Sequence, residues 1–244
     1  MRSRHISHDC LRCPVRGEQS FCDLSLSARE DLNKVTCRAI YPEGAKLFHE
    51  GQPPQGVFIL CAGSAKLWTS SSNGRTIIVR IARPGEVLGL NAAISGRPYG
   101  VSAEMMEPGQ ANFISCESLL DLMKDHSEVA VRVAEQLSAV YYTAHDEVRT
   151  LGLTAHPAER LAKLLLSWTS NARQSDGGDD SLPVRLTLNH EEIGQTIGTT
   201  RQTVTRVLSE FRKRQMLELR KSVLCIQDRP ALEKVSGLTF EALL

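Results

Sequence analysis

The sequence predicts an α+β protein that begins with a β-barrel or jelly roll, continues with a long helix and ends with a helix-turn-helix unit. Short apolar runs separated by glycine and proline turns fill residues 35–115, which is typical of small antiparallel β domains. Apolar residues then recur at helical spacing over residues 127–151. Two short helical segments that meet at Gly198 follow, and the second is rich in arginine. A length of 244 residues is compatible with two modest units.

The first 23 residues (1–23) form an arm that carries three of the seven cysteines. No apolar stretch follows Met1, so we expect no signal peptide. No run approaches the roughly 18 apolar residues of a membrane span, and the protein is therefore predicted to be cytoplasmic, without a membrane partner. After the arm, a helix is predicted over residues 24–34, with Ser27 as its N-cap and Glu30 completing a capping box.

The β domain is predicted over residues 24–125, and a short helix over residues 117–125 ends it. Turn signals such as Pro42-Glu43-Gly44 separate its strands. The predicted strands are Cys37–Tyr41, Val57–Cys61, Ala65–Trp68, Thr76–Ile81 and Ala111–Ser115. Because Cys61 ends an apolar run, it is interpreted as a small hydrophobic core residue.

A long helix is predicted over residues 127–151, inside a connecting segment of residues 126–153. One face alternates spacings of four and three residues, as a coiled-coil seam does. It consists of Val133, Leu137, Val140, Ala144, Glu147 and Leu151. A second apolar face consists of Ala130, Ala134, Tyr141 and Val148. One face can pack on the barrel and the other on a second copy of the chain, so we expect a homodimer; the alternative is that the seam packs on the chain's own barrel.

The C-terminal unit is predicted over residues 154–230 and starts with a helix over residues 158–172 and a loop over residues 174–181. Asn189 is predicted to cap the next, short helix, with Glu192 completing its capping box. Gly198 can take the positive φ that a tight turn requires.

A second short helix is predicted to begin after Thr199 or Thr200 and to end near Lys213. Strands over residues 216–219 and 223–226 then form a wing with Arg220-Lys221-Ser222 at its tip, and residues 231–244 are predicted to be a tail.

Positive charge is concentrated in this unit. Between residues 200 and 221, seven Lys or Arg residues accompany two Glu residues, although the whole chain has a net charge of only +1. Such a segment indicates a polyanion-binding surface, and the alternative is two packed helices with an incidental basic face. The second helix has an apolar face of Val204, Val207, Leu208 and Phe211. The predicted DNA contacts lie opposite it: Thr200, Arg201, Gln202, Thr205, Arg206, Ser209 and Arg212.

The chemistry of these side chains suits duplex DNA. Arginine can bridge O6 and N7 of guanine, and glutamine can bridge N6 and N7 of adenine, in the major groove. Thr205 can contact a thymine methyl group, whereas Ser209 and Arg212 are better placed for phosphates.

Two regions of the chain resemble the CRP/FNR family of transcription regulators. Residues Ile193-Gly194-Gln195, Gly198, Arg201-Gln202-Thr203-Val204 and Arg206-Val207-Leu208 are similar to the DNA-binding helices of that family. Residues Val57-Phe58-Ile59-Leu60 and Pro84-Gly85-Glu86-Val87-Leu88-Gly89 are similar to its β-roll of the cyclic-nucleotide-binding type. The resemblance covers residues 24–230.

The resemblance implies a homodimer that binds palindromic double-stranded DNA through a winged helix-turn-helix and contacts RNA polymerase. Family members that bind a GTGA-type half-site have Arg-Glu on the recognition helix, where this chain has Arg201-Gln202. Since glutamate prefers cytosine and glutamine prefers adenine, the half-site base at that position stays open.

In the cAMP-binding branch of this family, a glutamate binds the ribose and an Arg-Ser pair binds the cyclic phosphate. Here Leu90 replaces the glutamate, and Tyr99-Gly100 replaces the Arg-Ser pair. A buried phosphate would be poorly compensated without the arginine, although Arg97 lies nearby. The sequence therefore argues against a cAMP sensor, and a cyclic-nucleotide-responsive regulator is kept as an alternative.

The FNR-like branch, which is a better match, senses oxygen through a [4Fe–4S] cluster held by N-terminal cysteines and one later cysteine. Cys10, Cys13 and Cys22 supply three thiols. Asn112 stands where the distant ligand would be, so the fourth ligand is open, with Cys116 and Cys37 as candidates. The options are a cluster with displaced ligation, a zinc site that uses His5 or His8, a thiol–disulfide switch without a cluster, or an inert remnant.

Three classes of function compete. A DNA-binding regulator controlled by a redox, oxygen or small-molecule signal accounts for both ends of the chain. A β-roll that regulates protein partners would not need the basic helix-turn-helix. A thiol oxidoreductase would have its C-x-x-C motif at a helix N-terminus in a βαβ context, which this arm lacks. We therefore expect a regulator that is not an enzyme.

Overall fold

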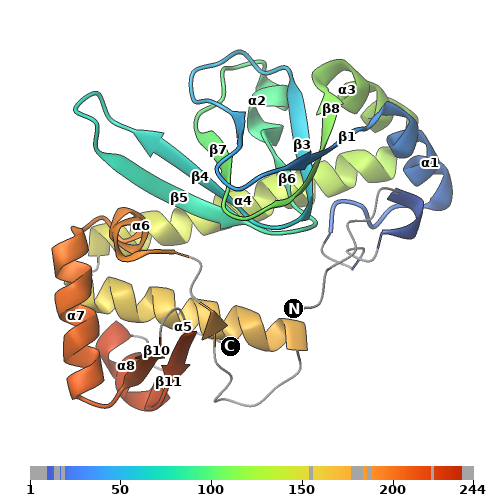
Figure 1. Ribbon diagram of the computed structural model, residues 1–244. Coiled ribbons are helices and arrows are strands. Elements are labelled where there is room, and N and C mark those ends of the chain that lie inside the picture. The colour runs from blue at the N-terminus through green and yellow to red at the C-terminus, as the bar shows by residue number, and fades with distance from the viewer. Residues whose placement is uncertain are drawn as a thin grey trace. The chain divides into compact units, whose positions relative to one another are not determined.

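The computed structural model describes residues 10–13, 17, 20–153, 156–176, 184–185, 188–220 and 223–237 (Figure 1). The chain forms two compact units, Met1–Ala144 and His145–Leu244. No helix in the described ranges is long and apolar enough to cross a membrane. His5, His8, residues 177–181 of the predicted loop, and Lys221 and Ser222 at the wing tip lie outside the described residues.

The N-terminal unit contains two four-stranded antiparallel sheets, which confirms the predicted jelly roll. The first sheet has the order β1 (Cys37–Tyr41), β8 (Gly109–Ser115), β3 (Gly56–Ala62) and β6 (Val87–Leu88). The second has the order β2 (Lys46–Phe48), β7 (Ser102–Met105), β4 (Ala65–Ser70) and β5 (Thr76–Ala82). All five predicted strands are confirmed; β2, β6 and β7 were not predicted, because two to four residues are too few to show a period of two.

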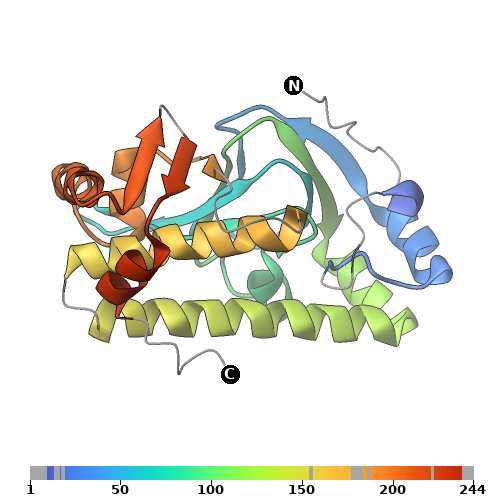
Figure 2. The ribbon, with the colours of Figure 1, turned by 90° about the horizontal axis from the view of Figure 1, so that it is seen from below.

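Alternate residues of β3 face two different cores. Phe58 and Leu60 pack between the sheets, whereas Val57 and Ile59 point to the outer face of the first sheet. That outer face is covered by α1 (Leu26–Val35), α3 (Cys116–Asp125) and the first half of α4 (Ser127–Leu153), which lie side by side in Figures 1 and 2. A short 3-10 helix, η1 (Cys10–Arg12), lies next to α1, and α2 (Leu90–Ser95) follows β6.

The N-cap of α1 differs from the prediction. Ser25, not Ser27, accepts a hydrogen bond from the Ala28 amide, so Glu30 forms no capping box. The Ser25 amide and hydroxyl both donate to the carboxylate of Glu128 at the start of α4. A negative charge at a helix N-terminus is favourable, and this long-range contact decides which of two nearby serines starts the helix.

The first half of the predicted seam on α4 packs on the β-roll, which is the alternative given above, and its second half, with Val140 and Ala144, is exposed. Val133 of the predicted seam is 2% exposed, and it packs with Leu137 against the β-roll. The stripe Val131, Ala134, Ser138, Tyr141, His145 and Val148 is exposed instead. Val131, Tyr141 and Val148 expose 56%, 66% and 70% of their surface. Because both faces are apolar, periodicity alone did not tell which one meets the sheet.

The C-terminal unit consists of α5 (Pro157–Asp176), α6 (His190–Thr196), α7 (Arg201–Lys213), a small sheet and α8 (Arg229–Ser236). The sheet pairs β10 (Leu217–Arg220) with β11 (Val223–Ile226), which confirms the predicted hairpin, and adds β9 (Val184–Arg185) at the edge of β11. The predicted tail is wrong up to residue 236, because α8 buries Leu232 and packs against α5. Asp228 caps α8 through the Ala231 amide.

Candidate functional site

The turn between α6 and α7 is built by local capping. Asn189 caps α6, and Glu192 reaches back to the Asn189 amide, so the predicted capping box is confirmed. Gly198 has a φ of +66°, which glycine adopts without strain. Thr200, rather than Thr199, caps α7 by accepting a hydrogen bond from the Thr203 amide. These contacts fix where α7 starts and therefore which residues share its outer face.

In the sequence, Gly194 is only one residue of the motif shared with the family. In the structure, it packs closely against the turn at Thr199 and Thr200. The Thr199 amide donates to the Gly194 carbonyl at 2.8 Å. A Cβ atom at residue 194 would lie 2.9 Å from the Thr199 carbonyl oxygen. The signal in the sequence is a glycine inside a short helix, which costs about 1 kcal/mol relative to alanine and therefore needs a reason.

We expect Gly194→Ala to destabilise the C-terminal unit by about 1–3 kcal/mol, because backbone atoms must shift to admit the methyl group. Urea unfolding followed by far-UV circular dichroism measures the change. Gly100→Ala is the control, since a Cβ atom there meets nothing within 4 Å. Equal midpoints for Gly194→Ala and the wild type would contradict the close approach of α6 and α7.

The two faces of α7 are cleanly separated. Val204, Leu208 and Phe211 are buried, and Val207 is half-buried. Arg201, Gln202, Thr205, Arg206, Ser209 and Arg212 are all exposed, and the first five line a shallow hollow. In Figure 1, α7 lies at the edge of its unit.

The outer face of α7 keeps its positive charge, because the nearby acidic side chain pairs with a different arginine. Glu210 pairs with Arg214 at 2.8 Å, toward the C-terminal end of α7. Within the described ranges, no ion pair engages Arg201, Arg206 or Arg212. The Thr205 hydroxyl donates its proton to the Arg201 carbonyl, and its oxygen can accept a hydrogen bond from Nδ1 of His190 in α6 at 3.0 Å. These contacts hold the hydroxyl while the side chain stays on the surface.

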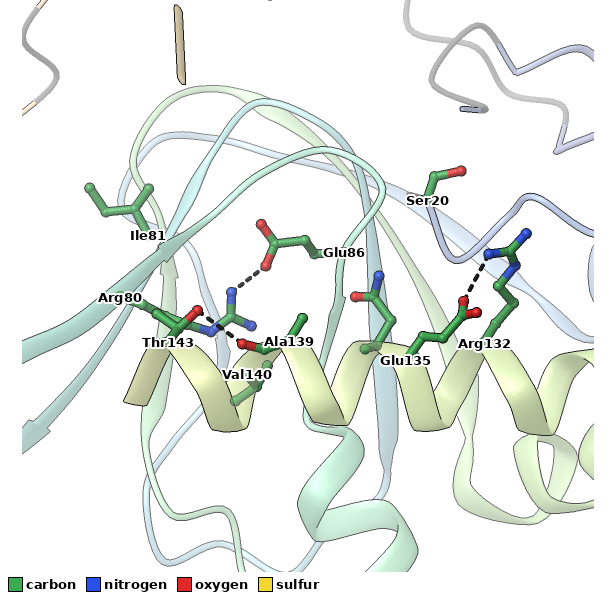
Figure 3. Close-up of a pocket in the computed structure, with 10 residues that line it drawn as sticks. Ser20, Arg80, Ile81, Glu86, Arg132, Glu135, Ala139, Val140 and Thr143 are labelled. Atoms are coloured by element: carbon green, nitrogen blue, oxygen red, sulfur yellow. Dashed lines mark hydrogen bonds and ion pairs between the residues drawn. The ribbon is translucent and has the colours of Figure 1, made fainter. Parts of the chain in front are cut away.

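A cavity of about 650 Å³ lies in the N-terminal unit between the β-roll and α4 (Figure 3). Arg80 pairs with Glu86 on the roll side, and Arg132 pairs with Glu135 at 2.8 Å on the α4 side. Ala139, Val140 and Thr143 complete the α4 wall. This cavity could not be predicted from the sequence, because its lining residues come from separate segments. Its size and mixed lining suit a small molecule.

The position that the family resemblance assigns to the cAMP phosphate is occupied by an aromatic side chain. Tyr99 is 5% exposed, and its ring stacks on Phe48 with centroids 4.2 Å apart. Its hydroxyl donates to the Gly56 carbonyl at 2.7 Å. Leu90, at the position of the ribose-binding acid, is buried in the core under α1 and α3, and Arg97 is exposed.

The three arm thiols, Cys10, Cys13 and Cys22, gather at the outer face of the first sheet. Asn112 of β8 donates to the Cys10 sulfur at 3.7 Å. The pKa of Cys22 is raised to about 12, mainly by burial and then by the neighbouring Cys10 and Cys13, while the Arg29 guanidinium acts to lower it. No set of three described His, Cys, Asp or Glu side chains is arranged to hold a single metal ion.

The remaining cysteines lie in different surroundings. Cys37 is exposed on β1, and Cys116 donates to the Pro54 carbonyl at 3.5 Å. Cys61, interpreted above as a core residue, is half-buried on the same face as the arm thiols. The pKa of Cys61 is raised mainly by burial and also by the neighbouring arm thiols. The charge of Arg38 acts to lower it.

Comparison with known proteins agrees with this architecture. The chain matches the model of a cyclic nucleotide-binding domain over residues 38–126 and that of a Crp-like helix-turn-helix domain over residues 159–235. The CRP-like cAMP-activated global transcriptional regulator of Mycobacterium tuberculosis is 26% identical over 208 residues, which are 85% of this chain and 92% of that protein. The anaerobic regulatory protein of Pasteurella multocida is 27% identical over 196 residues, 79% of this chain and 69% of the other.

Solved structures share the fold. FixK2 from Bradyrhizobium japonicum superposes with a TM-score of 0.72 at 22% identity, and the match covers 84% of this chain and 99% of FixK2.

Proposed function

This chain belongs to the CRP/FNR family of transcription regulators, and from that premise we propose that it acts as a homodimer that binds a palindromic DNA site without catalysing a reaction. The recognition helix of each copy, α7, enters the major groove of one half-site. The observation that carries this proposal is the outer face of α7, where exposed arginines that have no acidic partner among the described residues lie opposite a buried apolar face. Contact with RNA polymerase, which the family resemblance implies, is part of the same proposal.

The side chains of α7 have different roles in this proposal. Arg201, Gln202 and Arg206 lie near the N-terminal end of the helix and contact base edges. Thr205 contacts a thymine methyl group, because its hydroxyl is already bonded to His190 and the Arg201 carbonyl. Thr200, Ser209 and Arg212 contact phosphates and fix the register of the helix on the duplex.

Salt dependence tests DNA binding directly. Each phosphate contact releases counterions, so the logarithm of the affinity should fall linearly with the logarithm of salt concentration, by about 0.9 per contact. Fluorescence anisotropy with a labelled duplex at several salt concentrations measures this slope. A slope near zero, or no binding at low salt, would exclude a duplex as the ligand of the α7 surface.

We place the dimer contact on the exposed stripe of α4. Val131 and Tyr141 are the large apolar side chains of this stripe in the N-terminal unit, and both are more than half exposed. Alternating spacings of three and four residues let two such helices pack along a shared seam. The domain boundary near residues 152–154, at the end of α4, belongs to the same proposal.

The signal is proposed to act on the N-terminal unit through the arm thiols. Cys10, Cys13 and Cys22 would bind a [4Fe–4S] cluster, which supplies an oxygen-sensitive group when it is present. The end of the arm is attached to α4, because Arg132 binds the carboxylate of Asp23 at 2.5 Å. Two residues further on, Ser25 at the N-cap of α1 binds Glu128 of α4. A change in the arm therefore bears directly on the helix assigned to the dimer contact.

The cavity beside α4 is a second place where a signal can act. A small molecule bound there would touch Ala139, Val140 and Thr143 of the same helix. A cAMP-responsive regulator is disfavoured, because Tyr99 fills the phosphate position and its hydroxyl is bonded to Gly56. Zinc at the arm thiols is kept as an alternative, because its proposed further ligands, His5 and His8, lie outside the described residues.

A further inference from the structure

We propose that Cys61 of β3 is the fourth ligand of a [4Fe–4S] cluster whose other ligands are Cys10, Cys13 and Cys22. This assignment deepens the redox signal proposed above and rests on it, but it does not depend on DNA binding. Cys61 replaces Cys116 and Cys37 as the candidate for the fourth ligand. In the sequence, its place at the end of an apolar run predicts only a core residue.

The strands bring Cys61 and the arm to one surface. Side chains of a strand alternate between its faces, and Ile59 and Cys61 of β3 both pack on the core under α1 and α3. On the neighbouring strand β8, Asn112 is paired with Ile59. Asn112 is buried and donates to the Cys10 sulfur at 3.7 Å, so the first arm thiol lies over the same part of the sheet as Cys61.

Backbone hydrogen bonds bring Cys22 to the same end of β3. The amide of Phe21 donates to the Gly85 carbonyl at 2.9 Å, and the amide of Gly85 donates to the Leu60 carbonyl at 2.8 Å. Phe21 precedes Cys22, and Leu60 precedes Cys61, so a single residue of the roll joins the two cysteine-bearing segments. Cys22 and Cys61 pack against the same buried cluster, as Cys116 also does, so it is the hydrogen bonds through Gly85 that relate Cys22 to Cys61.

The η1 segment that carries the C-x-x-C pair is held by α1. Arg29 donates to the carbonyl of Leu11, which lies between Cys10 and Cys13, at 3.4 Å, and to the carbonyl of Leu24 at 3.0 Å. The charges of Arg29 and Arg38 act on Cys22 and Cys61 respectively. Two guanidinium groups can therefore offset the negative charge that four thiolates and a cluster introduce.

Cys116 and Cys37 lie elsewhere. Cys116 follows Ser115, which pairs with Gly56 at the start of β3. Cys61 is five residues further along that strand, roughly 16 Å away at about 3.3 Å per residue. Cys37 pairs with Phe113, and cross-strand partners share a face, so Cys37 is on the opposite face of the sheet from Asn112.

Four thiols over one part of the sheet supply the ligand set of a [4Fe–4S] cluster. Ligands of a single zinc ion must all lie about 2.3 Å from it, and the described side chains contain no such set. In a [4Fe–4S] cluster each thiolate binds a different iron, so the ligands stand further apart. Assembly of the 2+ cluster takes two ferrous irons, two ferric irons and four sulfides, and each thiol loses its proton when it binds iron.

Buried amides lie beside the proposed site. The Nε2 atom of Gln110 donates to the Oδ1 atom of Asn112 at 2.9 Å, and Asn112 in turn donates to Cys10. The Oε1 atom of Gln110 is buried without a hydrogen-bond partner in the structure. Amide groups next to cluster sulfurs set the reduction potential, so Asn112 is assigned here as a hydrogen-bond donor to a ligand.

Anaerobic reconstitution of the full-length chain with ferrous iron, ferric iron and sulfide tests the assignment. We expect about four irons and four sulfides per chain in the wild type, with the visible absorption of an Fe–S cluster. Cys61→Ala should lower the iron content at least several-fold, and Cys22→Ala should lower it equally. Cys116→Ala and Cys37→Ala are the matched controls and should keep the wild-type content.

Three outcomes would overturn the proposal: wild-type iron content in Cys61→Ala, loss of iron in Cys116→Ala, or a wild type that binds only zinc or no metal. Should Cys61→Ala fail to fold, mild oxidation of the metal-free wild type with diamide and peptide mass spectrometry provides a second test. A disulfide from Cys61 to an arm cysteine supports the site, and a Cys61 that stays free while the arm cysteines pair overturns it.

DNA affinity is measured on the same samples, so the two proposals can fail separately. Metal-free protein that binds DNA leaves the regulator intact, whereas cluster-loaded protein that binds no DNA leaves the cluster site intact.

Discussion

Ala134→Glu is expected to convert the protein from a dimer to a monomer and to reduce its affinity for a palindromic site by about 100-fold or more. Ala134 lies exposed within the α4 stripe between Val131 and Ser138. In a two-fold symmetric dimer the same patch of both copies is buried, so the substitution would bury two carboxylates near each other. The desolvation penalty is several kcal/mol per ion, more than a small helical interface can offset.

Ala139→Glu is the matched control for this substitution. Ala139 is also an exposed alanine of α4, but it lines the cavity and is not part of the stripe. Sedimentation velocity of both variants gives the oligomeric state, and anisotropy on half-site and full-site duplexes gives the affinity. A dimeric Ala134→Glu variant, or equal dissociation of both variants, would contradict the interface on this stripe.

Arg206→Ala is expected to cost about 1–3 kcal/mol in binding, and to do so at one base pair of the half-site. Arg206 is exposed on α7 without an acidic partner in the described structure, so its guanidinium is available for a guanine edge. Substituting each base pair in turn should show full discrimination by the wild type and almost none by the variant at that single position.

Arg212→Ala provides the contrast, since Arg212 is another exposed arginine, about three helical turns from the start of the base-contacting residues. As a phosphate contact it should weaken binding to all sequences alike and lower the salt slope by about one. If Arg206→Ala instead weakened every duplex equally, Arg206 would be a phosphate contact and base recognition would rest on other residues.

The helix-turn-helix could be predicted from the sequence because its signals are local. The Asn189 cap, the Glu192 capping box and the turn at Gly198 each depend on residues within a few positions of one another. The two faces of α7 follow from a strong period of 3.6 residues, and all six polar positions of its outer face are exposed. What these side chains bind remains a prediction.

The features that sequence reasoning missed depend on contacts between distant segments. Both faces of α4 are apolar, and only the β-roll shows that Val133 is the inward residue. Ser25 rather than Ser27 caps α1 because Glu128, 103 residues away, binds it. Cys61 carries the pattern of a core strand, and its relation to the arm depends on how Phe21, Gly85 and Leu60 are joined.

The central claim is that the outer face of α7 recognises a base sequence in two symmetric half-sites. Selection of duplexes from a random library by the full-length protein, followed by sequencing, tests it most directly. We expect an enriched inverted repeat whose half-site centres lie about one helical turn, or 10–10.5 base pairs, apart. With Arg206→Ala, the preference at one position of each half-site should be lost. An unenriched pool, or a single half-site without its inverted partner, would contradict it.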